Sequence, residues 1–241
     1  KLLILEHPIR DEKGGSYKNL YVAGIDSIDA DDSTSTGQKQ VSEFCIVVKR
    51  RQFGLQEPTI VAIYKDRPKD VREAYETALK LLQFYDCQAV LESTRVGLVT
   101  HFKNLNKTSY LMKRPRATQS DVLNGKSNMF GTPATPAVIV HYKELIANFI
   151  SDYCHNIAFR EMLIQALTYS DEFKKKFDII AAWGMCELGD EELYAYQPTI
   201  RNNIAKQWTN DIGFYTDEYG KKRYGIIPNK KRKEWPQQRW N

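Results

Sequence analysis

Hydrophobic and polar positions along this chain follow two periods, one typical of strands and one typical of helices. Short apolar runs that are rich in β-branched residues and bounded by turn-forming residues indicate buried strands. Runs of this kind predict strands at residues 20–25, 43–49, 59–64, 88–91 and 109–112. The second and third of these strands are joined by a turn around Gly54 to Pro58, which is typical of a meander.

Helical spacing begins after Pro68, a residue that suits the first turn of a helix. Apolar residues then recur every three or four positions up to Tyr85, and we expect this helix to end near Asp86. The same spacing predicts further helices at residues 96–105, 136–154, 159–169 and 178–188. The polar segments 27–40 and 113–132 show little periodicity and are expected to be loops.

The order of these elements predicts an α/β fold. Three sequential strands, a crossover helix, a strand, a helix, a strand and then helices are satisfied by a central five-stranded mixed sheet flanked by helices, with right-handed crossovers. In that arrangement the first core strand lies beside the fourth. The carboxyl ends of these two strands then meet at one edge of the sheet.

Three acidic residues stand at the ends of apolar elements. Asp26 closes the first core strand, Glu92 closes the strand at 88–91, and Asp178 opens the last helix. Three carboxylates brought together repel one another unless a divalent cation holds them. Because the strand order makes Asp26 and Glu92 neighbours, and the last helix can deliver Asp178, we predict that the three form a metal site.

Each acid also has a structural explanation that involves no metal. Asp26 could start a turn, Glu92 could be a surface acid, and Asp178 could be a helix N-cap. The small residues Ala181, Ala182 and Gly184 favour the site, because they would let the last helix lie close to the sheet.

Composition is that of a chain with one large domain: 241 residues, 42% hydrophobic and 27% charged. No apolar run has the length of a membrane helix, so we expect no membrane partner. The chain begins with Lys1 rather than Met, and we expect it to be a piece of a longer polypeptide.

Two further sets of residues carry predictions. The cysteines show no zinc-ligand spacing, and we expect all of them to be reduced core thiols in a cytoplasmic setting: Cys45, Cys87, Cys154 and Cys186. The cations at the end of the second core strand, Lys49, Arg50 and Arg51, are expected to be a solvated strand tip.

Four sequence segments together resemble a known family. They are Tyr21–Asp26, Val90–Gly97, Gly131–Thr135 before a long helix, and Lys176–Ala182. In this order and spacing they resemble the C-terminal nuclease domain of viral large terminases, the DNA-packaging motors of tailed bacteriophages. The resemblance spans roughly residues 20 to 190 and implies an RNase H-like fold.

The resemblance implies a metal-dependent endonuclease that cuts concatemeric double-stranded DNA during genome packaging by two-metal phosphodiester hydrolysis. It implies that Asp26 bridges two Mg²⁺ or Mn²⁺ ions, while Glu92 and Asp178 each hold one or reach it through water. Many relatives place another acid or a histidine beside the last aspartate, where this chain has Lys175, Lys176 and Phe177. A fourth ligand could come from the acidic loop with Asp29, Asp31 and Asp32, although a solvated loop is an alternative.

The resemblance also implies partners and a domain layout. Residues 1–19 would be a docking segment and linker from a missing upstream ATPase domain, 20–200 the nuclease domain, and 201–241 a basic C-terminal extension. The portal and the small terminase subunit would be partners, in the cytoplasm of an infected bacterial host.

DNA contacts are predicted from the distribution of charge. Residues 220–241 hold eight Lys or Arg and one Glu, a surplus larger than the net charge of +5 of the whole chain. The tail could bind DNA, dock on a packaging protein or be a solvated terminus. The predicted contacts after the last strand and in the tail are Lys113, Arg114, Arg116, Lys221, Lys222, Arg223, Lys230, Lys231, Arg232 and Lys233.

Two other functions remain open from the sequence. One is another RNase H-like nuclease, such as a Holliday junction resolvase. The other is a non-catalytic DNA- or portal-binding module whose acids are structural.

Overall fold

The computed structural model describes residues 1–29, 42–119, 130–170, 177–196, 198–200, 210–216 and 222–228. The chain divides into two compact units, residues 1–201 and residues 202–241. In the second unit, β8 (Asn210–Thr216) and β9 (Lys222–Pro228) form an antiparallel hairpin. All other elements described below belong to the first unit.

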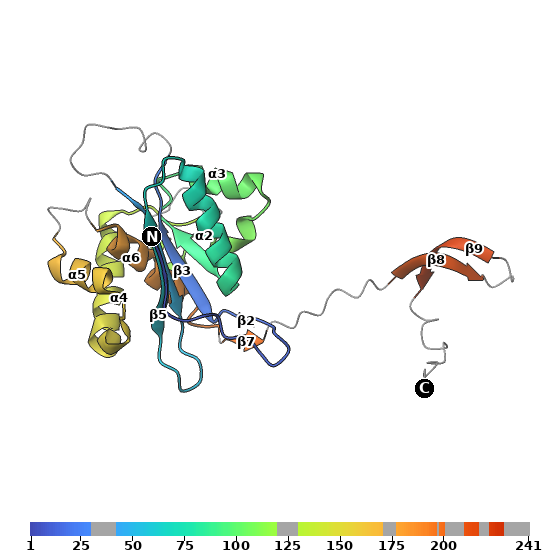
Figure 1. Ribbon diagram of the computed structural model, residues 1–241, viewed down its shortest axis with the longest axis horizontal. Helices are drawn as coiled ribbons and strands as arrows, with labels where there is room; N and C mark the ends of the chain where they lie inside the picture. Colours follow the sequence, from blue (N-terminus) through green and yellow to red (C-terminus); the bar gives the residue numbers. More distant parts are fainter. Residues whose placement is uncertain are drawn as a thin grey trace. The chain divides into compact units, whose positions relative to one another are not determined.

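A five-stranded mixed sheet forms the centre of the first unit (Figure 1). Its strand order is β1-β5-β4-β3-β6, in which β3 and β6 run parallel and every other pair is antiparallel. The strands are β1 (Leu2–Ile4), β3 (Tyr21–Asp26), β4 (Phe44–Arg50), β5 (Thr59–Asp66) and β6 (Gln88–Leu91). The predicted fold class, a five-stranded mixed sheet flanked by helices, is confirmed.

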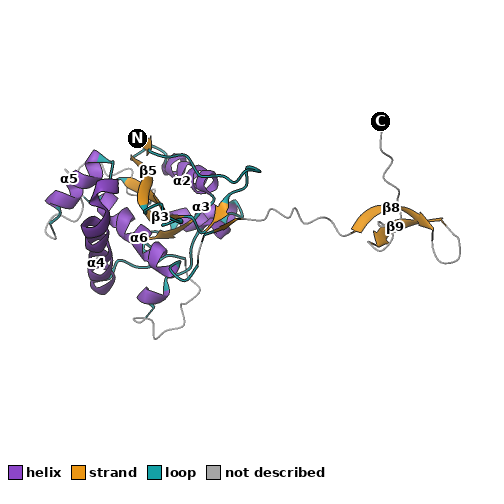
Figure 2. Cartoon of the chain, turned by 90° about the horizontal axis from the view of Figure 1, so that it is seen from below, coloured by secondary structure: helices purple, strands orange, loops and turns teal. Residues whose placement is uncertain are grey.

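Helices cover both faces of the sheet, as the views of Figures 1 and 2 show. The helices α2 (Val71–Tyr85) and α3 (Gly97–Asn104) share one apolar core with the first face. On the second face, a separate core includes α4 (Pro136–Tyr153), α5 (Arg160–Thr168) and α6 (Asp178–Glu192). The central strands read as continuous apolar runs because both of their faces are covered.

The strand predicted at residues 109–112 is wrong. The chain there forms a 3-10 helix, η1 (Thr108–Tyr110), and Leu111 makes an isolated parallel bridge to Ala89. The N–H of Leu111 bonds to the carbonyl of Thr108 inside this turn, at 3.0 Å, so too few residues are left to pair with β6. The fifth strand is instead β1 at the opposite edge, where Leu2 to Ile4 pair with β5.

The remaining described elements are short. The strands β2 (Tyr17–Lys18) and β7 (Thr199–Ile200) form a small antiparallel sheet. Two more 3-10 helices follow α3 and α4, namely η2 (Arg116–Thr118) and η3 (Cys154–Asn156). The prediction that all cysteines lie in the core is wrong for Cys154, which is exposed in η3, whereas the other three are buried thiols. None of the helices that the structure describes is long and apolar enough to cross a membrane.

Helix α6 lies directly on the centre of the sheet because of a glycine in β3. A Cβ added to Gly24 would lie 2.0 Å from the carbonyl oxygen of Ala182 and 2.1 Å from the backbone nitrogen of Cys186. Ala182 therefore makes the close approach that its small size predicts. Gly184 instead faces the Tyr142 ring of α4, so it serves helix–helix packing rather than contact with the sheet.

The prediction that Lys49, Arg50 and Arg51 form a solvated strand tip is wrong. Their exposed fractions are 2%, 7% and 7%. The Nζ of Lys49 lies 2.6 Å from Oε2 of Glu187 and 2.7 Å from Oδ2 of Asp190. Helix α6 covers this end of the sheet and supplies carboxylates from residues that lie far away in the sequence.

Candidate functional site

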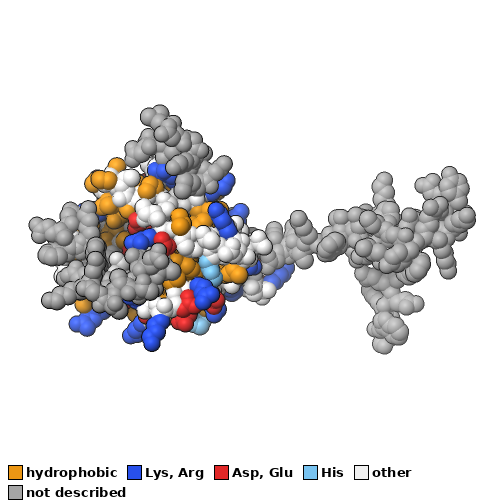
Figure 3. All heavy atoms as spheres, turned by 90° about the horizontal axis from the view of Figure 1, so that it is seen from above, with side chains coloured by type: hydrophobic (Ala, Val, Ile, Leu, Met, Phe, Trp, Pro, Cys, Tyr) orange, Lys and Arg blue, Asp and Glu red, His pale blue; other side chains and the backbone are white. Residues whose placement is uncertain are grey.

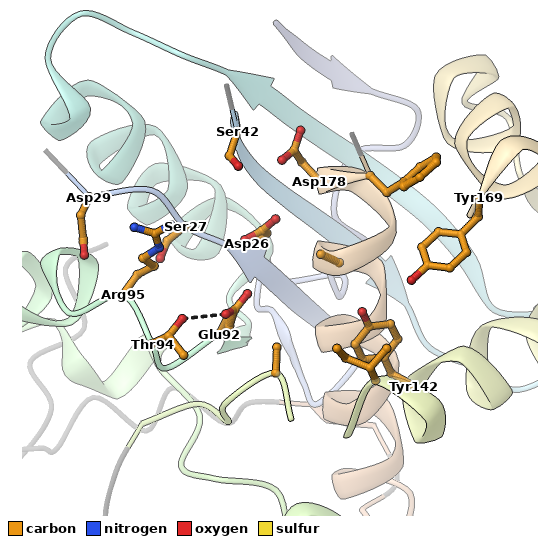
Figure 4. A pocket seen from close by; sticks show the side chains of 14 residues that line it. Asp26, Ser27, Asp29, Ser42, Glu92, Thr94, Arg95, Tyr142, Tyr169 and Asp178 are labelled. Carbon is orange, nitrogen blue, oxygen red and sulfur yellow. Dashed lines mark hydrogen bonds between the residues drawn. The ribbon is translucent and has the colours of Figure 1, made fainter. Parts of the chain in front are cut away.

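A cavity of about 590 Å³ lies at the carboxyl ends of β3 and β6, and Asp26, Glu92 and Asp178 all line it (Figure 4). In the close-up view, Asp26 lies between the other two acids. The polar residues Ser27, Asp29, Ser42, Thr94 and Arg95 line the same cavity, together with an apolar and aromatic wall.

Parallel pairing places Asp26 beside Glu92. Ile25 is paired with Leu91 in the register of β3 and β6, so each acid follows one member of that pair. The N–H of Glu92 donates to the carbonyl oxygen of Ile25 at 3.1 Å and fixes the start of the chain that leaves the sheet. The sequence therefore brings these two carboxylates together through strand order and register.

Asp178 comes from the first turn of α6, and the contact of this helix with Gly24 places that turn over the end of the sheet. The N-cap of the helix is Phe177, and no side chain caps the helix end. The alternative explanation of Asp178 as the N-cap is therefore wrong. Asp178 is 6% exposed, and the positive end of the helix dipole favours its charged form.

Burial and mutual repulsion set the electrostatics of the acids. Burial raises the pKa of Asp26 well above its usual range, and the negative charges of Glu92 and Asp178 raise it further, against the opposing effect of Arg95. Burial raises the pKa of Asp178 to about 6, although Lys65 and the backbone N–H of Glu43 stabilise its charged form. Both carboxylates therefore resist ionisation in the absence of a cation.

The donor set matches a hard divalent cation in kind. Carboxylate oxygens are the ligands that Mg²⁺ and Mn²⁺ prefer, and Ser27 adds a buried hydroxyl oxygen that has no hydrogen-bond partner among the residues that the structure describes. Within the described ranges, no three His, Cys, Asp or Glu side chains are close enough together to hold one ion. The three acids thus surround the cavity, and their side chains would have to draw together around a cation.

Asp29 has a second role at the edge of the cavity. Its Oδ1 accepts the N–H of Gly97 at 3.0 Å and so caps the start of α3, a helix whose own N-cap, Val96, provides no side-chain cap. Asp31 and Asp32, the other acids of that loop, lie outside the described residues, as do Lys175 and Lys176. Phe177 lines the cavity.

Sequence reasoning missed two polar residues of the cavity as individual candidates. The hydroxyl of Thr94 donates to Oε1 of Glu92 at 2.6 Å and orients that carboxylate (Figure 4). Arg95 brings a positive charge close enough to act on Asp26. Both follow Glu92 in the segment Val90–Gly97. Their closeness in sequence to Glu92 is the feature from which the sequence could have predicted that they line the cavity.

An aromatic wall was also missed. Tyr142 and Tyr169 line the cavity, and the Tyr169 ring packs against Phe177 with 4.9 Å between ring centroids. Lys143 lies over the Tyr169 ring at 4.8 Å from its centroid. Their helical spacing in the sequence gave no sign that they face the acids.

The cations predicted to bind DNA after the last strand do not line this cavity. The N–H and Nε of Arg116 donate to the carboxylate of Glu192, at the end of α6 opposite to Asp178. The guanidinium of Arg114 donates to the carbonyl of Thr118, and Lys113 makes a backbone bridge to Phe130. The expectation that this segment lies on the acid side of the sheet therefore fails for Arg116.

The predicted contacts of the tail are described in part. Lys222 and Arg223 belong to strand β9, whereas Lys221 and residues 230–233 lie outside the described part of the chain. On the face of the first unit seen in Figure 3, the coloured Lys and Arg side chains are interspersed with acidic and hydrophobic ones. A continuous basic track is not visible among the described residues of that face.

Comparison of the sequence with protein-family models and with curated proteins finds no match. Comparison of the fold with solved structures finds the large terminase nuclease from thermophilic phage G20c with bound zinc. The superposition covers 81% of this chain and 94% of that chain, with 11% sequence identity and a TM-score of 0.46.

Proposed function

We propose that this chain is a metal-dependent DNA endonuclease of the kind that the sequence resemblance implies, the nuclease domain of a viral large terminase. The observation that carries the proposal is the shared cavity of Asp26, Glu92 and Asp178, which lie in β3, directly after β6 and in α6. Carboxylates that are wholly or partly buried and repel one another lower the stability of the fold, and a divalent cation would offset this effect.

The bound metal would be Mg²⁺ or Mn²⁺, because the donors are oxygens. Asp26, Glu92 and Asp178 would hold it, because all three line the same cavity. When bound, such ions acidify a nucleophilic water and neutralise the charge that grows on the leaving oxygen of a phosphodiester. Thr94 keeps the Glu92 carboxylate oriented through its hydrogen bond.

Arg95 is the candidate for binding the DNA phosphate. Its guanidinium belongs to the cavity wall, and it is a cation among acids that would otherwise repel a phosphodiester. The aromatic wall of Tyr142 and Tyr169 would border the sugar or base next to the cut. These side chains would position the substrate, and the acids would position the metal.

The biological setting follows from the resemblance alone. We propose that the substrate is concatemeric double-stranded DNA during genome packaging, in the cytoplasm of an infected bacterial host. An upstream ATPase domain of the same polypeptide, the portal and the small terminase subunit would be its partners. The basic residues of 201–241 would bind DNA or one of these proteins.

A plasmid assay tests the proposal. The purified chain with Mn²⁺ should nick or linearise supercoiled plasmid, and Asp26→Asn and Glu92→Gln should each lower the rate at least a hundredfold. Matched controls are Asp152→Asn and Glu144→Gln, which change exposed acids of α4 and should leave the rate unchanged. Undiminished cutting by Asp26→Asn would refute the assignment of the site.

Substrate choice separates the two nuclease hypotheses. A terminase-like nuclease should cut linear duplex as readily as a four-way junction, whereas a junction resolvase should prefer the junction. Salt-sensitive binding of DNA without any cutting, at every Mn²⁺ concentration, would favour the non-catalytic binding module.

A further inference from the structure

The connection between β5 and α2, residues 67–70, lies at the same edge of the sheet as Asp26. Strand β4 is antiparallel to both β3 and β5, so β3 and β5 run in the same direction and end at the same edge. The chain therefore leaves β5 at the edge of the acid cavity before α2 begins at Val71. A hydrogen bond agrees with this position, because the guanidinium of Arg67 donates to the carbonyl oxygen of Ser42, which lines the cavity.

This connection carries positive charge at the surface. Lys69 is exposed, and it makes no hydrogen bond or ion pair with any residue in the described ranges. Arg67 is partly exposed and is anchored at the rim of the cavity by its bond to Ser42. Arg72, in the first turn of α2, is exposed too, but Asp70 already pairs with its guanidinium. Lys69 is therefore the cation of this group whose ammonium contacts none of the described acids.

Cations at the opposite edge of the sheet are arranged differently. Lys49, Arg50 and Arg51 are buried there, and each is paired with an acid of the fold. Lys65, near the end of β5, is likewise held by carboxylates and is 14% exposed. Pairs of this kind hold the fold together and are not available to a ligand on the surface. The connection after β5 differs because its lysine remains available to an anion.

Arg95 stands on the other side of Asp26. It follows the end of β6 by a few residues and lines the cavity, and β6 lies on the side of β3 that faces away from β5. The strand order β5-β4-β3-β6 therefore places Asp26 between two cationic segments. Because neighbouring strands lie about 4.8 Å apart, the ends of β5 and β6 are roughly 14 Å apart.

A DNA strand that crosses this edge needs positive charge on both sides of the acids. The carboxylates repel its phosphates, and a metal ion offsets that repulsion chiefly at the phosphodiester next to the ion. Lysine and arginine contacts to phosphates fix the position of DNA without reading its sequence. A span of roughly 14 Å corresponds to about four nucleotides, at about 3.4 Å for each nucleotide of a duplex strand. The two cationic segments can therefore contact phosphates on the two sides of the cut.

We propose that the connection 67–70, chiefly through Lys69, binds a backbone phosphate of DNA on the side of the cut opposite to Arg95. The inference rests on the proposed function, because the acids mark the position of the cut and DNA is the partner. Lys69 then binds a phosphate that does not react. The arrangement requires DNA on both sides of the cut, as in an endonuclease and unlike an exonuclease.

The salt dependence of DNA binding tests this contact. Fluorescence anisotropy of a labelled duplex oligonucleotide, with Ca²⁺ in place of Mn²⁺, gives the association constant at several KCl concentrations. Each phosphate contact contributes about 0.9 to the slope of the logarithm of this constant against the logarithm of the salt concentration. Lys69→Met should therefore lower the magnitude of the slope by about one, whereas Lys69→Arg, which keeps the charge, should retain it.

Lys80→Met is the matched control. Lys80 is an exposed lysine of the same helix that follows the connection, and it lies roughly 14 Å along the axis from Val71, in the direction away from the acid edge. The substitution removes the same charge and should leave the slope unchanged. Equal losses in the Lys69 and Lys80 variants would show a general effect of net charge and would overturn the proposal.

Cutting kinetics provide a second measurement. Lys69→Met should raise the KM for a duplex oligonucleotide at least threefold and leave kcat nearly unchanged, because a contact to a phosphate that does not react is equally strong before and in the transition state. The unfolding temperature should stay the same, because the side chain is exposed. A lower kcat at an unchanged KM would contradict the assigned contact.

The outcomes separate this inference from the proposed function. A Lys69→Met variant that cuts DNA and shows an unchanged salt slope would overturn the inference and leave the nuclease assignment intact. An unaltered chain that neither binds nor cuts DNA would contradict the proposed function itself. The unaltered chain should also spare about the last two base pairs at each end of a linear duplex, and stepwise removal of nucleotides from an end would contradict the two-sided contact.

Discussion

At the scale of residues, Asp26 and Asp178 are placed where their ionised forms lower the stability of the metal-free fold. Burial and the neighbouring carboxylates raise the pKa of Asp26, and burial raises the pKa of Asp178 to about 6. An acid whose pKa is higher in the folded state penalises folding whenever it is ionised. For Asp178, the difference from the ordinary value of 3.8 corresponds to about 3 kcal/mol above pH 6.

This penalty predicts a stabilising substitution. Asp178→Asn should raise the free energy of unfolding of the metal-free protein at pH 8, by up to about 3 kcal/mol. The gain should shrink as the pH falls from 6 to 4, because the native carboxyl group then becomes protonated in the folded state and later in the unfolded state. Urea unfolding of both proteins with a chelator present, at several pH values, measures this difference in the free energy of unfolding.

The control for this prediction is Asp152→Asn, which changes an exposed acid and should have little effect on the free energy of unfolding at any of these pH values. Addition of Mn²⁺ should reverse the order and stabilise the native protein more than Asp178→Asn. A destabilised Asp178→Asn at pH 8 would show that the carboxylate supports the fold rather than a cation site.

The sequence revealed the acids but not their cationic neighbours, for a physical reason. A carboxylate at the end of an apolar strand is conspicuous because it ends a buried run, as Asp26 and Glu92 do. A lysine at the same kind of position is ordinary, because most strand ends are solvated. Lys65 and Lys49 both end buried strands, and only the packing of α5 and α6 shows which acids surround them.

At the scale of elements, the position of Asp178 depends on how closely α6 approaches β3. The backbone atoms of α6 lie where a side chain at Gly24 would be. The periodicity of hydrophobic residues predicted both elements, and the small residues of α6 indicated a close approach of this helix to the sheet. The strand glycine that permits this approach carried no such indication, because a single glycine in a strand has several explanations.

Gly24→Ala should therefore separate the helix from the sheet. The added methyl group has backbone rather than flexible side chain in front of it, so we expect a loss of about 3 kcal/mol or more in the free energy of unfolding. Any protein that still folds should bind Mn²⁺ more weakly, because Asp178 moves with the helix. Thermal or chemical unfolding, followed by a Mn²⁺ titration, measures both effects.

Gly54→Ala is the matched control for this substitution. Gly54 has a positive φ of 59°, and nothing lies within 4 Å of an added Cβ. The substitution should therefore lower the free energy of unfolding only by the backbone strain, about 1–2 kcal/mol. Equal losses for the two variants would contradict the role assigned to Gly24.

The other end of α6 is fixed by a buried ion pair. Lys49 contacts Glu187 at 2.6 Å, and the indole N–H of Trp183 donates to the same carboxylate at 2.7 Å. Burial raises the pKa of Glu187, although Lys49 opposes this effect. Lys49→Met should lower the free energy of unfolding by about 3–5 kcal/mol, because it leaves the buried Glu187 carboxylate without the positive charge of Lys49.

Combining Lys49→Met with Glu187→Gln should recover most of this loss, since the glutamine removes the uncompensated charge and still accepts the bond from Trp183. Chemical unfolding of the two single variants and the double variant forms a complete cycle. Additive losses would show that the pair does not act as a unit.

At the scale of the whole molecule, the topology explains why residues 26, 92 and 178 line one cavity. Parallel pairing of β3 with β6 brings the first two together, and α6 crosses the sheet to bring the third. The order of elements was sufficient to predict this. It was not sufficient to predict β1 at the outer edge or the small β2–β7 sheet, because such short strands have almost no periodicity of their own.

The charge distribution over the whole chain was a weaker guide. The surplus of positive charge lies in residues 220–241, within the second compact unit. The first unit instead places a few cations, Lys65 and Arg95 among them, next to particular acids. Net charge describes solubility and long-range attraction to DNA, whereas the chemistry of the site depends on these local pairs.

Anomalous X-ray diffraction from crystals grown with Mn²⁺ tests directly whether Asp26, Glu92 and Asp178 hold a divalent ion. We expect an anomalous peak in the cavity within ligand distance, about 2.0–2.4 Å, of carboxylate oxygens of Asp26, Glu92 and Asp178. The peak should be absent in Asp26→Asn. A cavity without an anomalous peak at saturating Mn²⁺, or a peak bound by other residues, would show that these three acids do not form the metal site.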